Sequence, residues 1–315
     1  MTIAEHAVIA GYRMVLGRDP ESQQTIIDQA QDNETLEQFY ASLISSQEFQ
    51  RKTVLRGVGM LYNSPPQQIE VDVAPAVLEK LIERTQRGWE RLGATEPYWS
   101  VVTFDKFRGG DLSPEVKREF YEMGPKSADL VELFEARAGT RVARGTCLEL
   151  GCGVGRVTAF LAQKFERVIA VDISPGNLKL CEEYLIAQGI RNVECILVER
   201  LQDYERVEAF DFLYSLMVLM HNSPPVQRYI LDCLTRKIAR GGAALIQATA
   251  SLPGYSFGAA SYLASPEPAR EMEMHALPMV HVLRILQRNG LEVLEVAMDT
   301  WTYDPGSYTY FAAKG

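Results

Sequence analysis

The sequence predicts an α/β protein: a doubly wound, mostly parallel seven-stranded sheet behind an all-helical N-terminal domain. Three observations support this fold class. From residue 130 onward, short aliphatic runs alternate with segments of helical periodicity. A glycine-rich stretch at residues 151–155 follows the first of these runs. The last two runs are separated only by residues 300–306, which suits an antiparallel hairpin.

The overall composition excludes several classes of protein. The 315 residues are enough for two domains, and 47% hydrophobic with 23% charged residues is ordinary for a globular chain. A net charge of −9 without a Lys/Arg run argues against a nucleic-acid partner. Five cysteines without a Cys-x-x-Cys pair indicate reduced thiols in the cytoplasm, with neither a disulfide framework nor structural zinc. We expect no membrane span and no signal peptide.

The first region, residues 1–56, is expected to be a helical module. Its motif residues are Tyr12-Arg13, Leu16-Gly17-Arg18, Pro20 and Ser46-x-Glu48-Phe49. This pattern resembles a small helical domain of unknown function that occurs in bacterial chains, often beside glycan-handling or surface-protein modules. The resemblance implies a binding role, such as contact with a protein partner. A plain helical cap is the alternative.

The second region, residues 57–124, is expected to contain a linker and helices that precede the sheet. Glycine and proline punctuate residues 57–75, and a helix follows from 75 to about 92. Ser113 and Pro114 then predict the start of another helix. The aromatic residues Tyr98, Trp99 and Phe107 would either pack on a bound ligand or fill the space between domains.

The third region, residues 125–315, is expected to form the sheet. The predicted strands cover residues 147–150, 167–172, 193–198, 210–215, 243–248, 291–298 and 307–313. The predicted helices between them cover residues 130–138, 157–165, 174–188, 225–238 and 280–289. Ser174 and Pro175 suit an N-cap and first helical position, and Gly290 suits a helix end.

The glycine stretch joins the first strand to a helix, which is the recipe for a nucleotide site. Glycine lets the backbone turn sharply and approach a ligand closely. Arg156 stands where the dinucleotide fingerprint requires its third glycine, which counts against a nicotinamide or flavin site. Glu149 lies two residues before the loop, where a carboxylate repels pyrophosphate and suits a cationic ligand.

Residues 148–155 resemble the first motif of the class I S-adenosylmethionine-dependent methyltransferases, apolar-acidic-apolar-Gly-x-Gly-x-Gly, at every defined position. The resemblance extends over residues 125–315. It implies the fold of these enzymes, S-adenosylmethionine as cofactor and methyltransferase activity. It also implies that the helices of residues 57–124 cover the cofactor. The cofactor-binding residues that it implies are Glu149, Gly151, Cys152, Gly153, Gly155, Asp172, Ile173, Arg200, Leu201 and Leu216.

Four of these residues are argued from their places in the sequence. Asp172 ends the second strand, where a carboxylate can accept from ribose hydroxyls, as it would in an NAD enzyme. Relatives commonly carry an aspartate after the third strand, but here Asp203 comes late, so backbone groups near Arg200 and Leu201 are expected to meet adenine. Leu216 follows the fourth strand, at the end of the sheet where ligands bind.

Two histidines are candidate general bases for a hydroxyl acceptor. His221 follows the fourth strand, and His275 lies in a connection at residues 251–277 that is long enough to be a lid. Its aromatic residues would line the acceptor pocket, or the segment would merely cover the sheet. Either histidine has the alternative role of capping a loop or orienting the acceptor.

The predicted function is methyl transfer to a small molecule or glycan unit, with a hydroxyl as acceptor. One alternative is a non-catalytic S-adenosylmethionine-binding scaffold that contacts its partner through residues 1–56. The other is an NAD-dependent oxidoreductase, against which Arg156 and Glu149 count.

Overall fold

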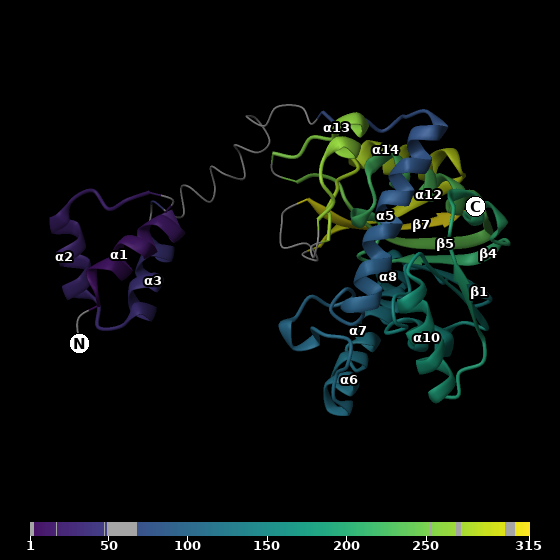
Figure 1. The fold of residues 1–315 in the computed structure, drawn as a ribbon, viewed down its shortest axis with the longest axis horizontal. Helices are drawn as coiled ribbons and strands as arrows, with labels where there is room; N and C mark the ends of the chain where they lie inside the picture. Colours follow the sequence, from purple (N-terminus) through teal and green to yellow (C-terminus); the bar gives the residue numbers. More distant parts are fainter. Residues whose placement is uncertain are drawn as a thin grey trace. The chain divides into compact units, whose positions relative to one another are not determined.

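The fold is described from a computed structural model. The structure describes residues 3–16, 18–46, 48, 68–252, 254–268, 272–299 and 306–315. Several sequence predictions, namely Gly17, Phe49, the linker at 57–67 and the connector at 300–305, lie outside these residues. The chain divides into two compact units, Met1–Pro66 and Gln67–Gly315 (Figure 1).

The first unit is helical, as predicted. It contains α1 (Glu5–Gly11), the π-helical turn η1 (Tyr12–Leu16), α2 (Gln23–Asp32) and α3 (Leu36–Ser45). Ser22 and Thr35 cap α2 and α3 by accepting backbone N–H groups. Arg18 donates to Glu48 at 2.7 Å and lies 5.2 Å from the Tyr12 ring centroid. The motif residues of this module therefore contact one another and stabilise its fold.

The second unit contains a seven-stranded sheet in the order β3-β2-β1-β4-β5-β7-β6. The strands are β1 (Thr146–Leu150), β2 (Arg167–Asp172), β3 (Val193–Leu197), β4 (Phe210–Ser215), β5 (Ile238–Thr249), β6 (Leu291–Met298) and β7 (Ser307–Lys314). The first five pair in parallel, whereas β7 pairs antiparallel with both β5 and β6. The predicted doubly wound sheet with a closing antiparallel pair is confirmed.

Helices cover both faces of this sheet. They are α5 (Pro75–Thr95), α6 (Pro114–Tyr121), α7 (Gly124–Ala128), α8 (Leu130–Ala138), α9 (Thr158–Lys164), α10 (Pro175–Ala187), α11 (Leu201–Arg206), α12 (Pro224–Arg236), α13 (Ala259–Ala264) and α14 (Met279–Arg288), with single 3-10 turns η2 (Asp105–Phe107) and η3 (Leu219–His221). Helices α5, α11, α12 and α14 share a core with Leu148 and Ile169. Helices α8 and α9 share the opposite core with Cys147 and Val168. Alternate strand residues thus face opposite layers.

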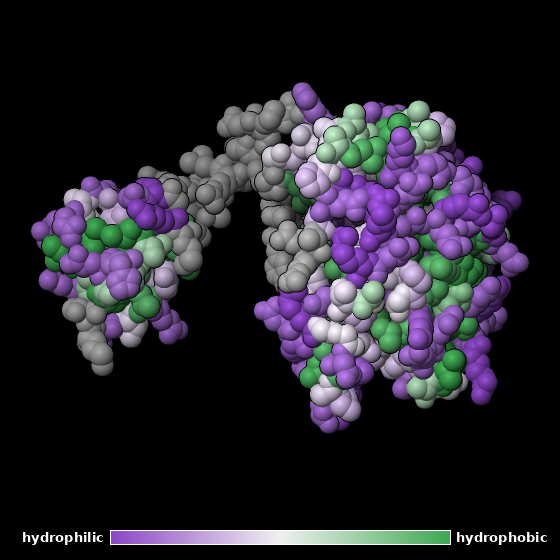
Figure 2. Space-filling model, viewed as in Figure 1, coloured by the Kyte–Doolittle hydropathy of each residue, from purple (hydrophilic) through white to green (hydrophobic). Residues whose placement is uncertain are grey.

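Helix α5 is amphipathic and contacts α10, α12 and α13. Leu81, Ile82 and Leu92 are buried, whereas Glu83 and Arg87 are exposed. Figure 2 shows mainly hydrophilic residues over the visible side of this helix. The buried face of α5 therefore points to the interior, where it can cover the carboxyl ends of the strands.

The structure extends some predicted elements and adds others. Strand β5 begins at Ile238, because Ile238 pairs with Phe210 before a register shift and Gly241 adopts a φ of 79°. The second unit begins before α5, since Ile69 forms a bridge with Phe257. Short helices such as α7, α11 and α13 were not predicted, because one or two turns carry too little periodicity.

Candidate active site

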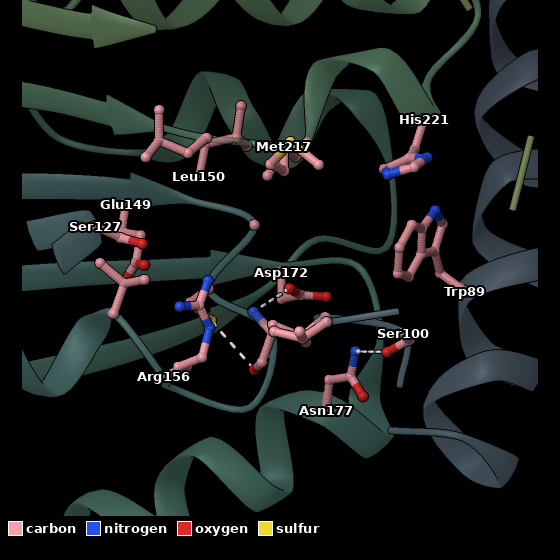
Figure 3. Close-up of a pocket in the computed structure, with 18 of the residues that line it drawn as sticks. Trp89, Ser100, Ser127, Glu149, Leu150, Arg156, Asp172, Asn177, Met217 and His221 are labelled. Atoms are coloured by element: carbon pink, nitrogen blue, oxygen red, sulfur yellow. Dashed lines mark hydrogen bonds between the residues drawn. The ribbon is translucent and has the colours of Figure 1, made fainter. Parts of the chain in front are cut away.

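A cavity of about 690 Å³ lies at the carboxyl ends of β1, β2 and β4 (Figure 3). This volume is in the range of small-molecule sites. The lining residues come from helices α5, α10, α11 and α12, the segment after α5, the α6–α7 region, the glycine loop, the strand ends with the turn after β4, and the 272–274 segment. They are Trp89, Trp99, Ser100, Val101, Val102, Thr103, Phe104, Glu122, Met123, Lys126, Ser127, Glu149, Leu150, Gly151, Cys152, Gly153, Arg156, Val157, Val171, Asp172, Ile173, Asn177, Tyr204, Tyr214, Leu216, Met217, Val218, Met220, His221, Asn222, Ile230, Met272 and Met274.

The glycine loop requires glycine for two different reasons. Gly151 has a φ of 72°, and a Cβ there would lie 2.3 Å from the Val218 side chain. Its N–H donates to Val171 at 2.7 Å, which holds the loop against β2. Gly155 has a φ of 83°, and a Cβ there would lie 2.8 Å from the Cys181 sulfur. Gly151 therefore lets the loop lie close to Val218 in the turn after β4, whereas Gly155 lets the loop pack on α10.

Asp172 is tied to the loop at the centre of the cavity (Figure 3). Its Oδ2 accepts from the Gly153 N–H and its Oδ1 from the Ser174 N–H, both at 2.8 Å. Burial raises the pKa of this carboxyl, and the backbone N–H groups oppose that rise. The carboxylate is thus held in one orientation with lone pairs left for a hydroxyl ligand.

Glu149 and Arg156 lie at one end of the cavity, beside Ser127 (Figure 3). Burial raises the pKa of Glu149 to about 7, against smaller lowering effects of Thr158 and the Arg156 charge. Among the described residues, Glu149 Oε2 and Arg156 Nε have no hydrogen-bond partner. Buried polar atoms normally have partners, so this end of the cavity fits a ligand that carries both a cation and an anion.

His221 lies at the opposite end, facing Trp89 (Figure 3). The two ring centroids are 5.3 Å apart at 65°. His221 Nδ1 lies 3.0 Å from the Glu273 carbonyl oxygen, and burial lowers the pKa of the imidazole. Because a carbonyl oxygen only accepts, Nδ1 is the donor, and the neutral ring presents Nε2 as its basic nitrogen.

Comparison with known proteins supports this interpretation of the loop. Residues 147–242, which run from β1 into β5, match the family model described as "Methyltransferase domain". Residues 147–242 are therefore similar to a methyltransferase domain, and they lie in a sheet of order β3-β2-β1-β4-β5-β7-β6.

Curated relatives share only part of their length with this chain. The tRNA/tmRNA (uracil-C(5))-methyltransferase of Nitratiruptor sp. is 30% identical over 106 residues, which cover 31% of this chain and 29% of that protein. The protein of the same name from Citrobacter koseri is 26% identical over 126 residues, covering 37% of this chain and 34% of that protein. The chain thus spans about a third of these relatives.

A solved structure resembles more of the chain. The N-methyltransferase NodS from Bradyrhizobium japonicum, in complex with S-adenosyl-L-homocysteine, is 15% identical, and the match covers 73% of this chain and 98% of that one with a TM-score of 0.49.

Most of the predicted cofactor residues of the methyltransferase domain line the cavity: Glu149, Gly151, Cys152, Gly153, Asp172, Ile173 and Leu216. Gly155 is not among the lining residues, because it faces Cys181. Arg200 and Leu201 are not either. Leu201 is buried at the start of α11, and the Arg200 N–H donates to Asp203 at 2.9 Å.

The two candidate bases occupy different environments. His221 lines the cavity, whereas His275 lies outside the lining set, packed against Tyr255, Phe257 and Tyr262. Its Nδ1 lies 2.8 Å from the Tyr255 hydroxyl, and burial lowers its pKa to about 4. The aromatic residues Tyr255, Phe257 and Tyr262 of the 251–277 connection thus pack around His275. Among the described residues of this connection, Met272 and Met274 reach the cavity.

Sequence reasoning missed several lining residues that come from distant elements. Trp89, Tyr204 and Ile230 belong to helices and reach the cavity only through the tertiary fold. Of the three predicted covering aromatics, Trp99 lines the cavity, while Tyr98 and Phe107 pack with Phe120.

The backbone of Met217 carries a signal that the sequence does not show. Met217 adopts a φ of 62°, which is strained for a residue with a side chain. Its N–H donates to Gln247 at 3.1 Å. Strain that a buried partner maintains marks the turn after β4 as part of the site.

Proposed function

We propose that this chain is an S-adenosylmethionine-dependent methyltransferase that methylates a hydroxyl of a small-molecule acceptor, with His221 as the general base. The observation that carries the proposal is the bond between His221 Nδ1 and the Glu273 carbonyl. It selects the tautomer whose Nε2 is free to accept a proton, and the lowered pKa keeps the ring neutral near pH 7.

The other residues of the cavity would position the reactants. When bound, S-adenosylmethionine supplies a methyl group on a sulfonium that is a good leaving group. Asp172 would accept from the ribose hydroxyls, and Glu149 and Arg156 would face the amino-acid end of the cofactor. Leu216 and the methionine side chains would exclude water from the reacting groups. Orientation and exclusion of water can supply most of the rate acceleration in such a transfer.

A small molecule is favoured over RNA as the acceptor, although the curated relatives carry the name of tRNA methyltransferases. The net charge of −9 opposes binding of a phosphate backbone.

A cysteine thiolate is also disfavoured as a nucleophile in this cavity. Cys152 lines the cavity, and although its contact with Cys181 lowers its pKa, burial and nearby acids raise the pKa to about 12 overall. The glycan class stays within the proposal because of the resemblance of residues 1–56.

No helix in the described part of the chain is long and apolar enough to cross a membrane. The proposal places the protein in the cytoplasm, where its cysteines would remain thiols.

The test is a screen with cofactor labelled on the methyl group against phenols, sugars, amines and RNA. We expect transfer to a hydroxylated small molecule. His221→Gln should lower turnover by about 10²–10⁴-fold and leave the affinity for S-adenosylhomocysteine (SAH) unchanged. His281→Gln on α14, outside the cavity lining, is the matched control. Transfer to RNA alone would overturn the acceptor class. Wild-type turnover by His221→Gln would show that His221 is not the general base. Cofactor binding without transfer to any acceptor would favour the scaffold alternative.

A further inference from the structure

Arg84 on α5 is buried, with 4% of its surface exposed, yet it lies outside the cavity lining. Its guanidinium donates to three backbone carbonyls at the end of α13, those of Tyr262 at 2.7 Å, Ser265 at 2.9 Å and Pro266 at 3.2 Å. It also lies 4.1 Å from the Tyr262 ring centroid. This single side chain therefore ties α5 to the 251–277 connection.

The same guanidinium holds Glu273. Arg84 Nη2 lies 2.7 Å from Glu273 Oε1, and Nε lies 3.4 Å from Oε2. The Tyr262 hydroxyl also donates to Glu273 Oε2. Two donors from different elements thus fix this carboxylate.

The backbone of Glu273 connects this network to the cavity. Its carbonyl accepts from His221 Nδ1, and its neighbours Met272 and Met274 both line the cavity. The next residue, His275, donates its N–H to the Met220 carbonyl at 2.7 Å, which aligns the segment with η3. Moving the Glu273 side chain would displace the carbonyl that sets the His221 tautomer.

We propose that Arg84 is a positioning residue of the active site, which acts through Glu273 to orient His221 and to hold Met272 and Met274 against the cavity. The inference rests on the proposed role of His221. Arg84 itself does not touch the reacting groups.

A second arginine on the same helix provides a matched control. Arg87 pairs with Glu267 of the same connection at 2.6 Å, but the side chain of Arg87 is 54% exposed. Its loss removes one ion pair between the same two segments without changing Glu273. A general loosening of the connection would affect both arginine variants, whereas the proposed role belongs to Arg84.

The test measures the His221 ring directly in the 315-residue chain. Long-range ¹⁵N NMR of histidine-labelled protein identifies which ring nitrogen is protonated and follows the pKa. The charged and titratable groups beside His221 in this network are Glu273, Arg84 and His275. The chain has four histidines, so spectra of the single variants His221→Gln and His275→Gln identify the signals of these two rings. We expect the wild-type His221 signal to show one tautomer, protonated at Nδ1, and Arg84→Met to show a mixture with a pKa closer to the ordinary histidine value.

Arg84→Met should also lower kcat by about 10²-fold once an acceptor is identified, and leave the SAH affinity unchanged. Arg84→Lys should show a spectrum between those of the wild type and Arg84→Met. The control Arg87→Met should show the wild-type spectrum. If Arg84→Met does not fold, Tyr262→Phe removes one of the two donors to Glu273 and should shift the same signal. An unchanged His221 signal in these variants, with SAH still bound, would overturn the inference alone. If the wild-type protein does not bind SAH, the proposed function is overturned instead.

Discussion

Glu149→Gln is expected to change how stability depends on pH. Glu149 is 3% exposed, and burial raises its pKa from the ordinary 4.5 to about 7. The folded protein therefore holds a proton that the unfolded chain releases at lower pH. Between about pH 4.5 and 7 the unfolded state binds fewer protons, so the free energy of unfolding falls as pH rises and levels off above pH 7.

The magnitude follows from the two pKa values. A rise from 4.5 to about 7 corresponds to about 3 kcal/mol of stability lost between these limits. Glutamine has nearly the same shape and does not titrate. The variant should therefore lack this fall and gain about 3 kcal/mol relative to the wild type on going from pH 4.5 to pH 8. We also expect it to bind the cationic cofactor less tightly.

The assay is urea unfolding followed by tryptophan fluorescence across this pH range. All three tryptophans, Trp89, Trp99 and Trp301, belong to the second unit, so the signal reports on the methyltransferase domain. Glu135→Gln is the matched control, because Glu135 is equally buried but accepts from Val142 N–H and Arg144 at 2.7 and 2.8 Å. That variant should lose stability, by about 3–5 kcal/mol. Parallel pH profiles for Glu149→Gln and the wild type would refute the reasoning.

Three further predictions test the loop, the strand end and the modular organisation. Asp172→Asn leaves one buried N–H without its acceptor and should weaken SAH binding by at least about tenfold. Asp211→Asn, which lies outside the cavity lining, should leave SAH binding unchanged. Equal SAH affinities of the two variants in calorimetry would contradict this prediction. Gly151→Ala should lower the free energy of unfolding and abolish SAH binding. Gly189→Ala, at nearly the same φ but with no neighbour within 4 Å, should lower the free energy of unfolding by only about 1–2 kcal/mol. Similar melting temperatures and SAH affinities of the two variants would count against the close contact at Gly151. A chain shortened to residues 67–315 should fold and bind SAH as the full chain does, and insoluble protein would show that the units share a core.

The sheet was predictable because its parallel strands are short buried runs and each is followed by a helix. Glu149 and Asp172 could be placed for the same reason, since both lie at strand ends that meet at one edge of the sheet. Their orientation could not be predicted. That Asp172 bridges the loop and the start of α10 depends on the turn that Gly153 makes.

The rest of the site depends on contacts between distant segments. Trp89 and Arg84 lie on α5, about 130 residues before His221, and no local pattern shows that this helix closes over the strand ends. The role of His275 was equally hidden, because a histidine in a long connection has the same local sequence whether it reaches a cavity or packs under aromatic rings. The hydroxyl of Tyr255 and the rings around His275 account for its buried position.

The central claim is that the cavity binds S-adenosylmethionine and not a dinucleotide. Isothermal titration calorimetry of the full chain with S-adenosylhomocysteine, and separately with NAD, tests it most directly. We expect one S-adenosylhomocysteine molecule to bind per chain, with no comparable affinity for NAD. Tight NAD binding without S-adenosylhomocysteine binding would contradict the account, because Glu149 and Arg156 would then accommodate the pyrophosphate that they are argued to exclude.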